Sequence, residues 1–416
     1  MRVKERFRVC IVGSGFGGIN TLFNLKSRFG DSKDVEIILI SNSDSFVFTP
    51  LLHEVATGEV SPENVAYPIK KLQEEYGDFT FIQEKVIGIN FNDKKINCEN
   101  HNIDYDYLVL AVGVVNNYFG NESIKEHSLA LKNVEDAINI RTHISQSVEK
   151  IVNEPEVKSH KNFIVVGAGA TGIEIVGGLV FFIKDKLKNL GIERFDDINV
   201  YLVEATDKVL QEMQDEKYSS MAIKRLNQIG VNLLINHEVK NYDGKTAQIF
   251  DKKSNLLIDI DTENFIWAAG FKANPLNDNL DIAKDDKNKI IVDEYLSLSN
   301  YPEVYVLGDN AAVENQKLWT TAQVALQQSE TVAHNIYART KLFKYSKKFK
   351  YFHQGALVTI GKNYGISDLF GLKITGYSGW FIWKLIHVVK INGSSKKINV
   401  FFDWIKTLSY KRYGIT

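Results

Sequence analysis

The sequence predicts an α/β protein in which a unit of strand, glycine-rich turn, helix and strand occurs twice. The first copy begins with the apolar run Phe7–Val12, and the second begins about 150 residues later with Asn162–Val166. Uninterrupted apolar runs of this length are typical of buried parallel strands. The chain has 416 residues, which exceeds the usual length of one domain, so we expect two or three domains.

The first glycine turn, GSGFGG at residues 13–18, has the pattern of a dinucleotide-binding loop. Gly13 permits the tight turn, Gly15 lets a pyrophosphate approach the backbone, and Gly18 allows the helix to pack closely on the strand. The N-terminus of the following helix adds positive potential for phosphates. A glycine turn without a ligand is the alternative, and the strand before it and the helix after it disfavour that reading.

The second turn, GAGATG at residues 167–172, repeats the arrangement with Gly167, Gly169 and Gly172. The strand Asn199–Val203 leads into Glu204, whose carboxylate can accept hydrogen bonds from both ribose hydroxyls of an NAD adenosine. That carboxylate would repel the 2′-phosphate of NADP, and the residues just after it include no arginine. The second turn therefore favours NADH over NADPH.

Further elements are expected between and after the two turns. The strand Val35–Ile40 completes the first unit, and it is followed by Ser41 where an acid would bind a ribose more firmly. We also expect a helix over Ile173–Leu190, short alternating segments at Thr80–Ile82, Val86–Phe91 and Lys95–Cys98, and strands at Tyr107–Val112, Asn264–Ala269 and Val304–Leu307.

Two dinucleotide sites in one chain imply that one holds a flavin, because two nicotinamides have no useful redox chemistry with each other. Gly308 and Asp309 follow a predicted strand, and an aspartate there can bind the ribityl chain of FAD. Such a Gly-Asp pair is common in turns, so its support comes from the two glycine turns.

Composition narrows the possible functions. The two cysteines, Cys10 and Cys98, lie far apart with no metal-binding spacing, so we expect neither a disulfide framework nor a metal site. The N-terminus runs from charged residues directly into a strand and does not have the pattern of a signal peptide. No uncharged apolar stretch approaches the ~20 residues of a membrane span.

The end of the chain is strongly basic although the whole chain has a formal net charge of −1. From residue 341 onward there are 14 lysines and arginines against two acidic residues. A basic segment of this kind favours an anionic surface as its partner, such as a membrane or a nucleic acid.

Two amphipathic stretches in this segment, Gly379–Ile391 and Val400–Leu408, favour the membrane. In the first, Lys384, His387 and Lys390 recur every three residues, and we expect them on the face opposite the aromatic side chains. A helix that closes the core or a dimer interface is the alternative. Nucleic acid is disfavoured, since the aromatic residues do not alternate with the basic ones.

At this point the sequence resembles a known family, the type II (single-subunit, non-proton-pumping) NADH:quinone oxidoreductases. The resemblance covers nearly the whole chain, including the basic end. It is carried by IVGSGFGG, FVFTPLLHEVATG, YDYLVLAVG, GAGATGIEIVGGL, WAAGFKANPL, VYVLGDNA and TAQVALQQ, of which the last is the most specific. Departures are Ser41, where the family commonly has an acid, and Trp319-Thr320, where prolines are usual.

The resemblance implies a fold with an FAD domain at residues 1–115 and 300–340, an inserted NADH domain at 116–299, and a membrane-binding unit at 341–416. NADH would pass a hydride to FAD N5, and a quinone (ubiquinone or menaquinone) would take two electrons. Gln323 and Gln327 become candidates for the quinone site, and Glu174 matches a glutamate near the nicotinamide and quinone. Burial would raise the pKa of Glu174 and suit it to relay protons, whereas a first-turn carboxylate that merely favours the helix dipole is the alternative.

We expect these residues to bind the cofactors, with no metal ligand among them. The FAD set is Gly13, Gly15, Gly18, Ser41, Val86, Ala111, Gly113, Gly308, Asp309, Ala322 and Gln323. The NADH set is Gly167, Gly169, Gly172, Glu204, Ala269 and Gly270. We further expect a homodimer, monotopic on the cytoplasmic face of the cell membrane.

Two other functions stay open. The first is an NADH reductase of the same fold that serves another acceptor, such as sulfide, a thiol or a soluble redox protein. Thiol chemistry needs a cysteine beside the flavin, and the loop from Ser41 to His53 has none. The second is a flavoprotein that binds NADH as a signal and does not turn over.

Overall fold

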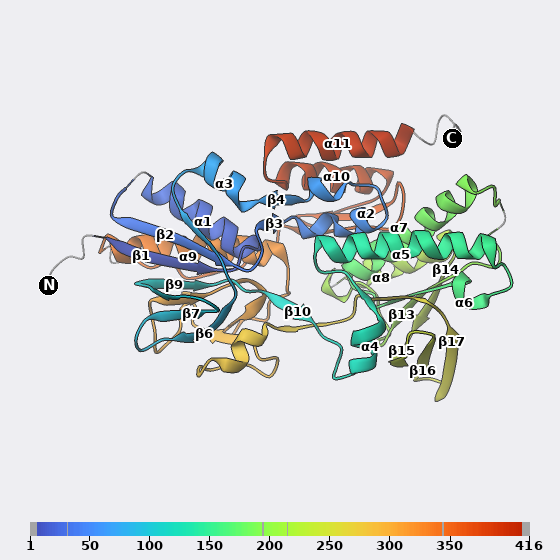
Figure 1. Cartoon of the computed structure of the whole chain (residues 1–416), viewed down its shortest axis with the longest axis horizontal. Coiled ribbons are helices and arrows are strands. Elements are labelled where there is room, and N and C mark those ends of the chain that lie inside the picture. Colours follow the sequence, from blue (N-terminus) through green and yellow to red (C-terminus); the bar gives the residue numbers. More distant parts are fainter. Residues whose placement is uncertain (1–5, 31, 194, 214, 343–344, 410–416) are drawn as a thin grey trace. The chain divides into compact units, whose positions relative to one another are not determined.

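A computed structural model describes residues 6–30, 32–193, 195–213, 215–342 and 345–409 (Figure 1). The contacts divide the chain into two compact units. The first unit comprises Met1–Val47, Tyr67–Val115 and Phe271–His353, and the second comprises Phe48–Ala66, Asn116–Gly270 and Gln354–Thr416. This division differs from the expected boundaries, because residues 271–299 and 341–353 group with the first unit and residues 48–66 and 354–416 group with the second.

The first unit is built on a parallel five-stranded sheet with the order β21-β9-β1-β2-β5. The strands are β1 (Phe7–Val12), β2 (Val35–Ser41), β5 (Thr80–Gln83), β9 (Tyr107–Leu110) and β21 (Val304–Val306). The residues of β1, β2, β9 and β21 are largely apolar and buried, as the uninterrupted apolar runs predicted, whereas the edge strand β5 has no buried residue.

Helices α1 (Phe16–Phe29) and α9 (Ala322–Thr340) pack against each other in this unit (Figure 1). Helix α1 starts directly after Gly15, and its buried Ile19, Leu22 and Leu25 follow helical spacing. Thr321 caps α9 by accepting a hydrogen bond from the amide of Val324 at 3.4 Å. Both helices therefore begin beside the carboxyl ends of parallel strands, where ligands bind in folds of this kind.

Smaller elements complete the first unit. An antiparallel sheet joins β6 (Val86–Asn90), β7 (Lys95–Cys98) and β8 (Asn102–Asp104), and β20 (Ile290–Val292) pairs with β22 (Ala311–Val313). That last pair explains why residues before 300 belong here. The other elements with residues in this unit are β3 (Ser45–Val47), β4 (Ala66–Pro68), α3 (Ile69–Tyr76), β10 (Val114–Asn116), β19 (Phe271–Ala273), η4 (Pro275–Asn279) and η5 (Gly308–Asn310).

The second unit repeats the parallel design with the order β11-β18-β12-β13-β14. These strands are β11 (Leu129–Ala130), β12 (Asn162–Val166), β13 (Asn199–Glu204), β14 (Val231–Ile235) and β18 (Asn264–Trp267). The helices are α2 (Leu52–Ala56), α4 (Glu122–His127), α5 (Val134–Asn153), α6 (Lys158–Lys161), α7 (Ala170–Asn189) and α8 (Glu216–Ile229), with short η1 (Thr49–Leu51), η2 (Pro62–Asn64) and η3 (Gln211–Met213). Helix α7 starts before the predicted Ile173, because Gly169 already serves as its N-cap.

Two antiparallel sheets complete the second unit. The first joins β15 (His237–Tyr242), β16 (Thr246–Asp251) and β17 (Leu256–Asp261). The second joins β23 (Gly355–Thr359), β24 (Gly365–Leu369) and β25 (Leu372–Gly376). The turn after β23 packs on α7 so closely that a Cβ on Gly177 would lie 2.4 Å from the amide nitrogen of Gly361.

The chain ends with the helices α10 (Tyr377–Lys390) and α11 (Ser394–Ser409). One residue of α10 faces the opposite way from the expectation. Trp380, Trp383 and Lys384 are buried, and α10 packs on β24. Lys384 therefore lies on the same buried face as Trp380 and Trp383. The expectation that it lies on the face opposite the aromatic side chains was wrong. The reason is a buried acidic partner, described below, which periodicity cannot reveal.

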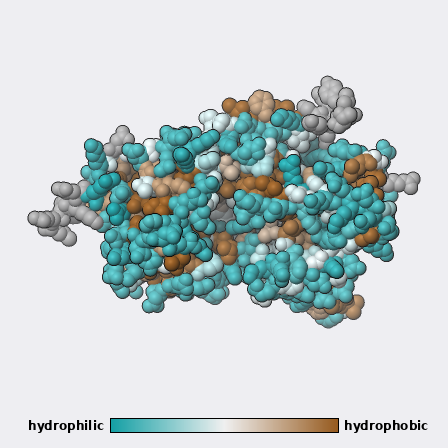
Figure 2. Space-filling view, viewed as in Figure 1, coloured by the Kyte–Doolittle hydropathy of each residue, from teal (hydrophilic) through white to brown (hydrophobic). Residues whose placement is uncertain are grey.

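The outward surface of these helices is apolar. Figure 2 shows apolar side chains gathered over the part of the molecule where Figure 1 places α11. The exposed apolar residues of β25, α10 and α11 are Leu372, Tyr377, Phe381, Leu385, Val389, Ile398, Phe401, Phe402 and Ile405. Among the described residues, no helix combines the length and apolar character that would let it cross a bilayer.

Candidate functional site

The first glycine turn has the geometry of a phosphate cradle. Gly13 has a φ of +107°, and a Cβ there would lie 2.4 Å from the carbonyl oxygen of Ala111. A Cβ on Gly18 would lie 1.8 Å from the carbonyl oxygen of Gly13, so both positions require glycine. At Gly15 a Cβ would meet no described atom within 4 Å. The turn is thus closed on the strand side and open where a pyrophosphate would approach, which fits FAD.

Ser41 lies beside this turn at the end of β2. Its hydroxyl is hydrogen-bonded to that of Ser14 at 2.8 Å and accepts the amide of Ser43 at 3.1 Å. Both serines of the pair are buried. The hydroxyl therefore contacts the glycine turn, and its predicted contact with the FAD ribose stays a prediction.

Gln328 holds the Gly308-Asp309 turn, and the sequence reasoning missed it. Its Oε1 accepts a hydrogen bond from the amide of Gly308 at 2.6 Å, and the residue is fully buried. Its Nε2 finds no hydrogen-bond partner among the residues that the structure describes. A buried donor of this kind is costly unless it is satisfied, which suits a site completed by a polar ligand. The doubled glutamine of TAQVALQQ was the available signal.

Two other glutamines of α9, Gln323 and Gln327, contact one three-residue segment of the first unit. The Gln327 amide pairs with the backbone of Phe352, donating to its oxygen at 2.8 Å and accepting from its nitrogen at 2.9 Å. The Tyr351 hydroxyl donates to Gln323 Oε1 and lies 3.2 Å from Nδ1 of His353. Burial raises the pKa of Tyr351, which keeps its hydroxyl protonated at neutral pH. Gln327 thus fastens this segment, and Tyr351 orients Gln323.

The remaining FAD-set residues occupy the same unit. Ala111 and Gly113 follow β9, and Gly113 has a φ of +65°. Val86 opens β6, and Ala322 opens α9. Their contacts with a flavin stay predictions.

The second glycine turn repeats the geometry of the first. Gly167 has a φ of +99°, and a Cβ there would lie 2.8 Å from the carbonyl oxygen of Ala268. A Cβ on Gly172 would lie 1.8 Å from the carbonyl oxygen of Gly167. The equivalent distance in the first turn is the same, so the two turns form two similar cradles.

Glu204 is anchored at this turn by three hydrogen bonds. Its Oε2 accepts the amide of Ala168 at 2.8 Å, and its Oε1 accepts the amide and the hydroxyl of Thr206 at 2.9 and 2.8 Å. A carboxylate retains further acceptor positions after these bonds. Its place at the end of β13 is that of the predicted ribose acceptor, and no described arginine hydrogen-bonds to it.

Ala269 and Gly270 follow β18 in a tightly packed stretch. Gly270 has a φ of +74°, and a Cβ there would lie 2.8 Å from the ring of Phe119. Its carbonyl oxygen accepts the amide of Asn117 at 3.2 Å. The contact of Ala269 and Gly270 with NADH stays a prediction.

Glu174 lies in a buried cluster of the second unit. Its Oε1 accepts the amide of Thr359 at 3.3 Å, and its Oε2 lies 3.5 Å from Nδ1 of His53. Burial raises the pKa of Glu174 well above its usual range, and burial followed by the charge of Lys384 lowers that of His53 to about 3. The carboxyl thus contacts β23, and His53 stays neutral at neutral pH.

A buried ion pair lies in the same cluster. Lys384 of α10 bonds to Glu54 of α2, and Trp404 of α11 donates its indole N–H to the other oxygen of Glu54 at 2.6 Å. The ammonium also lies 4.3 Å from the Trp404 ring centroid. The His387 ring stacks on Trp383 at 3.8 Å, and burial lowers its pKa to about 3. No sequence pattern predicts these partners.

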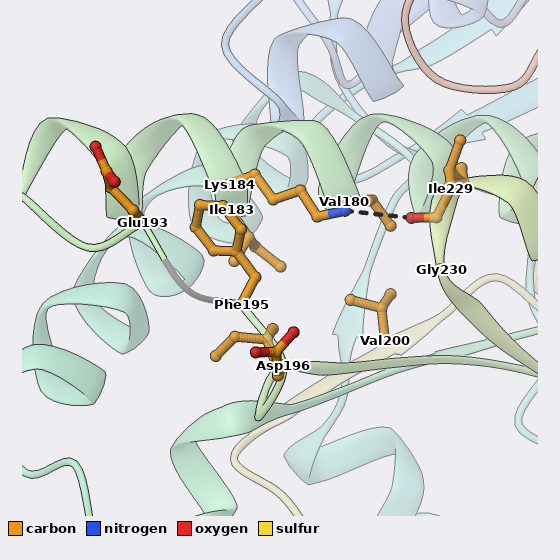
Figure 3. Close-up of a pocket in the computed structure, with 10 residues that line it drawn as sticks. Val180, Ile183, Lys184, Glu193, Phe195, Asp196, Val200, Ile229 and Gly230 are labelled. Atoms are coloured by element: carbon orange, nitrogen blue, oxygen red, sulfur yellow. Dashed lines mark hydrogen bonds between the residues drawn. The ribbon is translucent and has the colours of Figure 1, made fainter.

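A separate pocket of about 380 Å³ opens at the far end of α7 (Figure 3). Its walls include Val180, Ile183, Phe195 and Ile229, and the Lys184 ammonium donates to the Ile229 carbonyl oxygen at 3.4 Å. None of the predicted site residues lines this pocket. We therefore do not assign the redox chemistry to it.

Neither cysteine is suited to thiol chemistry. Cys10 lies in β1 and Cys98 in β7, and both are buried. Burial raises the pKa of Cys10 to about 12 and that of Cys98 to about 11. A thiol of such pKa is almost entirely protonated at neutral pH and is a poor nucleophile. Among the described residues, no group of three or more His, Cys, Asp or Glu side chains could hold a metal ion.

Comparison with known proteins gives consistent results. The family model for pyridine nucleotide-disulphide oxidoreductases matches residues 7–329. The chain is 30% identical to a probable NADH dehydrogenase of Dictyostelium discoideum, covering 99% of this chain and 91% of the relative. It is 30% identical to the type II NADH:quinone oxidoreductase Ndh of Mycobacterium tuberculosis, covering 99% and 90%.

Solved structures show the same fold. The structure of NDH2 from Plasmodium falciparum in complex with NADH superposes with a TM-score of 0.87 at 22% identity, covering 99% of this chain and 100% of that one. A sulfide:quinone oxidoreductase from Aquifex aeolicus superposes with a TM-score of 0.75 at 18% identity, covering 92% and 90%. The expected α/β fold with two dinucleotide-binding sheets is confirmed.

Proposed function

Because the chain belongs to the pyridine nucleotide-disulphide oxidoreductase family and matches type II NADH:quinone oxidoreductases along nearly its whole length, we propose that it is a non-electrogenic NADH:quinone oxidoreductase. The observation that carries the proposal is the pair of similar glycine turns, one in each unit. FAD, when bound, accepts a hydride from NADH and delivers two electrons to a quinone.

We assign FAD to the first turn and NADH to the second. The Gly308-Asp309 turn and the buried Gln328 amide accompany the first turn and suit a flavin. Glu204 accompanies the second turn, and its carboxylate favours a free ribose hydroxyl over a 2′-phosphate. NADH is therefore the preferred donor.

For the quinone, we propose Gln323 as the contact residue and Tyr351 as its positioning residue. Tyr351 donates to Gln323 Oε1 and so fixes the orientation of the side-chain amide, which is a group that can donate to a quinone carbonyl. Gln327 supports this segment through its bonds to the backbone of Phe352, and we keep it as the second candidate for the quinone site.

Glu174 is proposed as a proton carrier. Reduction of a quinone to a quinol by NADH consumes one proton in addition to the hydride. Burial raises the pKa of Glu174 well above its usual range and so favours the protonated carboxyl, and Nδ1 of the neutral His53 ring lies 3.5 Å from the Glu174 Oε2. These features favour a relay over a carboxylate that only interacts with the helix dipole.

We propose that the protein is monotopic on the cytoplasmic face of the cell membrane and that it forms a homodimer. The membrane assignment is supported by the exposed apolar surface of α10 and α11 and by the excess of basic residues after residue 341. The same apolar surface supports a homodimer, because contiguous exposed apolar residues mark membrane or protein contacts.

The decisive experiment follows the flavin colour of the purified, detergent-solubilised protein without oxygen. We expect NADH to bleach the flavin faster than NADPH and a quinone to restore the colour. Replacing Gln323 with a bulky residue should slow recolouring by quinone more than bleaching by NADH. Faster bleaching by NADPH, or recolouring by polysulfide and not by quinone, would refute the proposal. A reduced form that quinone leaves unchanged would indicate an NADH sensor.

A further inference from the structure

The two glycine turns differ at the position that faces a phosphate. In the first turn the space beyond Gly15 is open, with no described atom within 4 Å of a Cβ built there. In the second turn a Cβ on Gly169 would lie 3.5 Å from Oε1 and 3.8 Å from Oε2 of Glu212. A carboxylate thus lies at the second turn in the place that is empty at the first.

The Glu212 carboxylate also occupies a backbone amide to which a phosphate would bind. Its Oε1 accepts a hydrogen bond from the amide of Ala170, the first residue of α7. The free amides at a helix N-terminus are the groups that bind a dinucleotide pyrophosphate in this fold. Glu212 therefore satisfies, within the chain, an interaction that NADH would make.

The backbone of the η3 segment holds Glu212 over the turn. The amide of Leu210 donates to the carbonyl oxygen of Ala168 at 2.9 Å, and Leu210 is buried with a φ of +53°. A positive φ is an unfavourable conformation for a residue with a side chain, so the packing around Leu210 must hold it in place. Met213 is buried on the other side of Glu212. The contact with Ala170 is therefore built into the local fold.

The role that Glu212 plays here rests on the proposed NADH site at the second glycine turn. We propose that Glu212 is an internal competitor of the NADH pyrophosphate, which must displace the carboxylate from the amide of Ala170 to bind. The competitor weakens NADH binding and makes product release easier. Glu212 therefore affects both the affinity and the specificity of the dinucleotide site. A ligand without a pyrophosphate has no group to replace the carboxylate at the amide of Ala170.

The competition depends on the charge of Glu212. The titratable groups that interact electrostatically with Glu212 are Glu204 at the end of β13 and Glu174 in α7, and both are acids. Burial and then the charge of Glu204 raise the pKa of Glu212, while the hydrogen bond from Ala170 opposes them. Below that pKa the neutral carboxyl is a weaker acceptor, so the dissociation constant for NADH should fall as the pH is lowered.

The test measures binding of ADP-ribose to the FAD-loaded protein by titration calorimetry. ADP-ribose carries the pyrophosphate and does not reduce the flavin. We expect Glu212→Gln to bind it about 3- to 10-fold more tightly than the wild type at about pH 8, since a carboxylate at a helix N-terminus is stabilised to about that extent. The advantage should shrink as the pH is lowered to about 5.5.

Glu216→Gln is the matched control, because it removes one exposed negative charge from the same stretch without touching the turn. It should leave the dissociation constant within about twofold of the wild type. Glu212→Ser serves as a second variant with the same expected direction. Unchanged or weaker binding in both Glu212 variants overturns the inference. A wild type that binds no ADP-ribose, and whose flavin NADH does not bleach, refutes the proposed function itself.

Discussion

Three hydrogen bonds fix the carboxylate of Glu204 at the second glycine turn, and we propose that this carboxylate sets the preference for NADH over NADPH. A carboxylate that is already fixed in place loses little entropy when it accepts the ribose hydroxyls, and it repels a phosphate. Its neighbour Asp207 is exposed and makes no such bonds to the turn among the described contacts. Comparing variants of Glu204 and Asp207 therefore separates a contact at the turn from a general effect of negative charge on nucleotide binding.

We predict that Glu204→Ser lowers kcat/KM for NADH about tenfold or more and lowers the preference over NADPH by a similar factor, because a charge-assisted hydrogen bond is lost. Steady-state kinetics with both nucleotides would measure this. Asp207→Ser should change neither value by more than about twofold. Equal changes in the two variants would show that Glu204 acts only through its charge.

The burial of Glu174 carries a cost in stability, which is consistent with the proposed role as a proton carrier. Its pKa is raised in the folded protein, so the native state binds more protons than the unfolded state above the usual Glu pKa. Stability is therefore fully present below about pH 4, the unfolded value, and decreases as the pH rises toward the folded value.

Glu174→Gln should therefore raise the melting temperature at about pH 7 and leave it nearly unchanged at about pH 4. The same variant should slow recolouring of the flavin by quinone, since it cannot carry the proton. Thermal unfolding and stopped-flow absorbance measure the two effects. A melting temperature that drops at pH 7 would mean that the carboxylate is a structural ligand of Thr359.

At the scale of elements, helices α10 and α11 have two different faces. The inner face carries Lys384 and Trp404, which satisfy the buried carboxylate of Glu54. Deleting both helices would leave that carboxylate without its charged partner, and a broken buried pair costs about 3–5 kcal/mol. A deletion would therefore disturb folding as well as membrane binding, and exposed positions give a cleaner test.

Serine at Phe381, Leu385 and Val389 together should release the protein from anionic liposomes, because three apolar side chains no longer enter the lipid. Co-sedimentation with vesicles measures it. A matched control is serine at Leu256 and Leu257, which are exposed on β17 in the other antiparallel sheet. If the α10 variant still sediments, and size-exclusion chromatography shows that it has become smaller, the surface is a subunit contact.

At the scale of the whole molecule, each compact unit has its own parallel sheet and its own glycine turn. A ligand that binds only the folded form of one unit stabilises that unit by mass action, by about 2.7 kcal/mol at 100 times its dissociation constant. The two cofactors should therefore act on different parts of the unfolding transition.

We expect removal of FAD to lower the melting temperature of the first unit, and NAD⁺ added to the FAD-loaded protein to raise that of the second. Hydrogen exchange read separately over Phe7–Val12 and Asn162–Val166 would distinguish the units. Re-addition of FAD is the control for damage during its removal. Protection that changes equally in both segments would show that the units unfold as one.

The sequence by itself determined the repeated architecture of this protein. Phe7–Val12 and Asn162–Val166 are strands within the predicted bounds, and both glycine turns have the predicted conformation. Apolar runs and glycine spacing are local signals, because a buried strand and a tight turn impose their requirements on neighbouring residues. Element ends were less accurate, since capping by Gly169 and not hydrophobic spacing sets the start of α7.

Only the tertiary structure decided which side chains meet. The pairing of Lys384 with Glu54, the clamp of Gln327 on Phe352, and the approach of Glu212 to Ala170 join residues from separate elements. Periodicity along one helix cannot show whether a buried acidic residue of another helix lies opposite. Lys384 was therefore expected at the surface. Such contacts depend on packing between distant segments, which the order of residues specifies only through the complete fold.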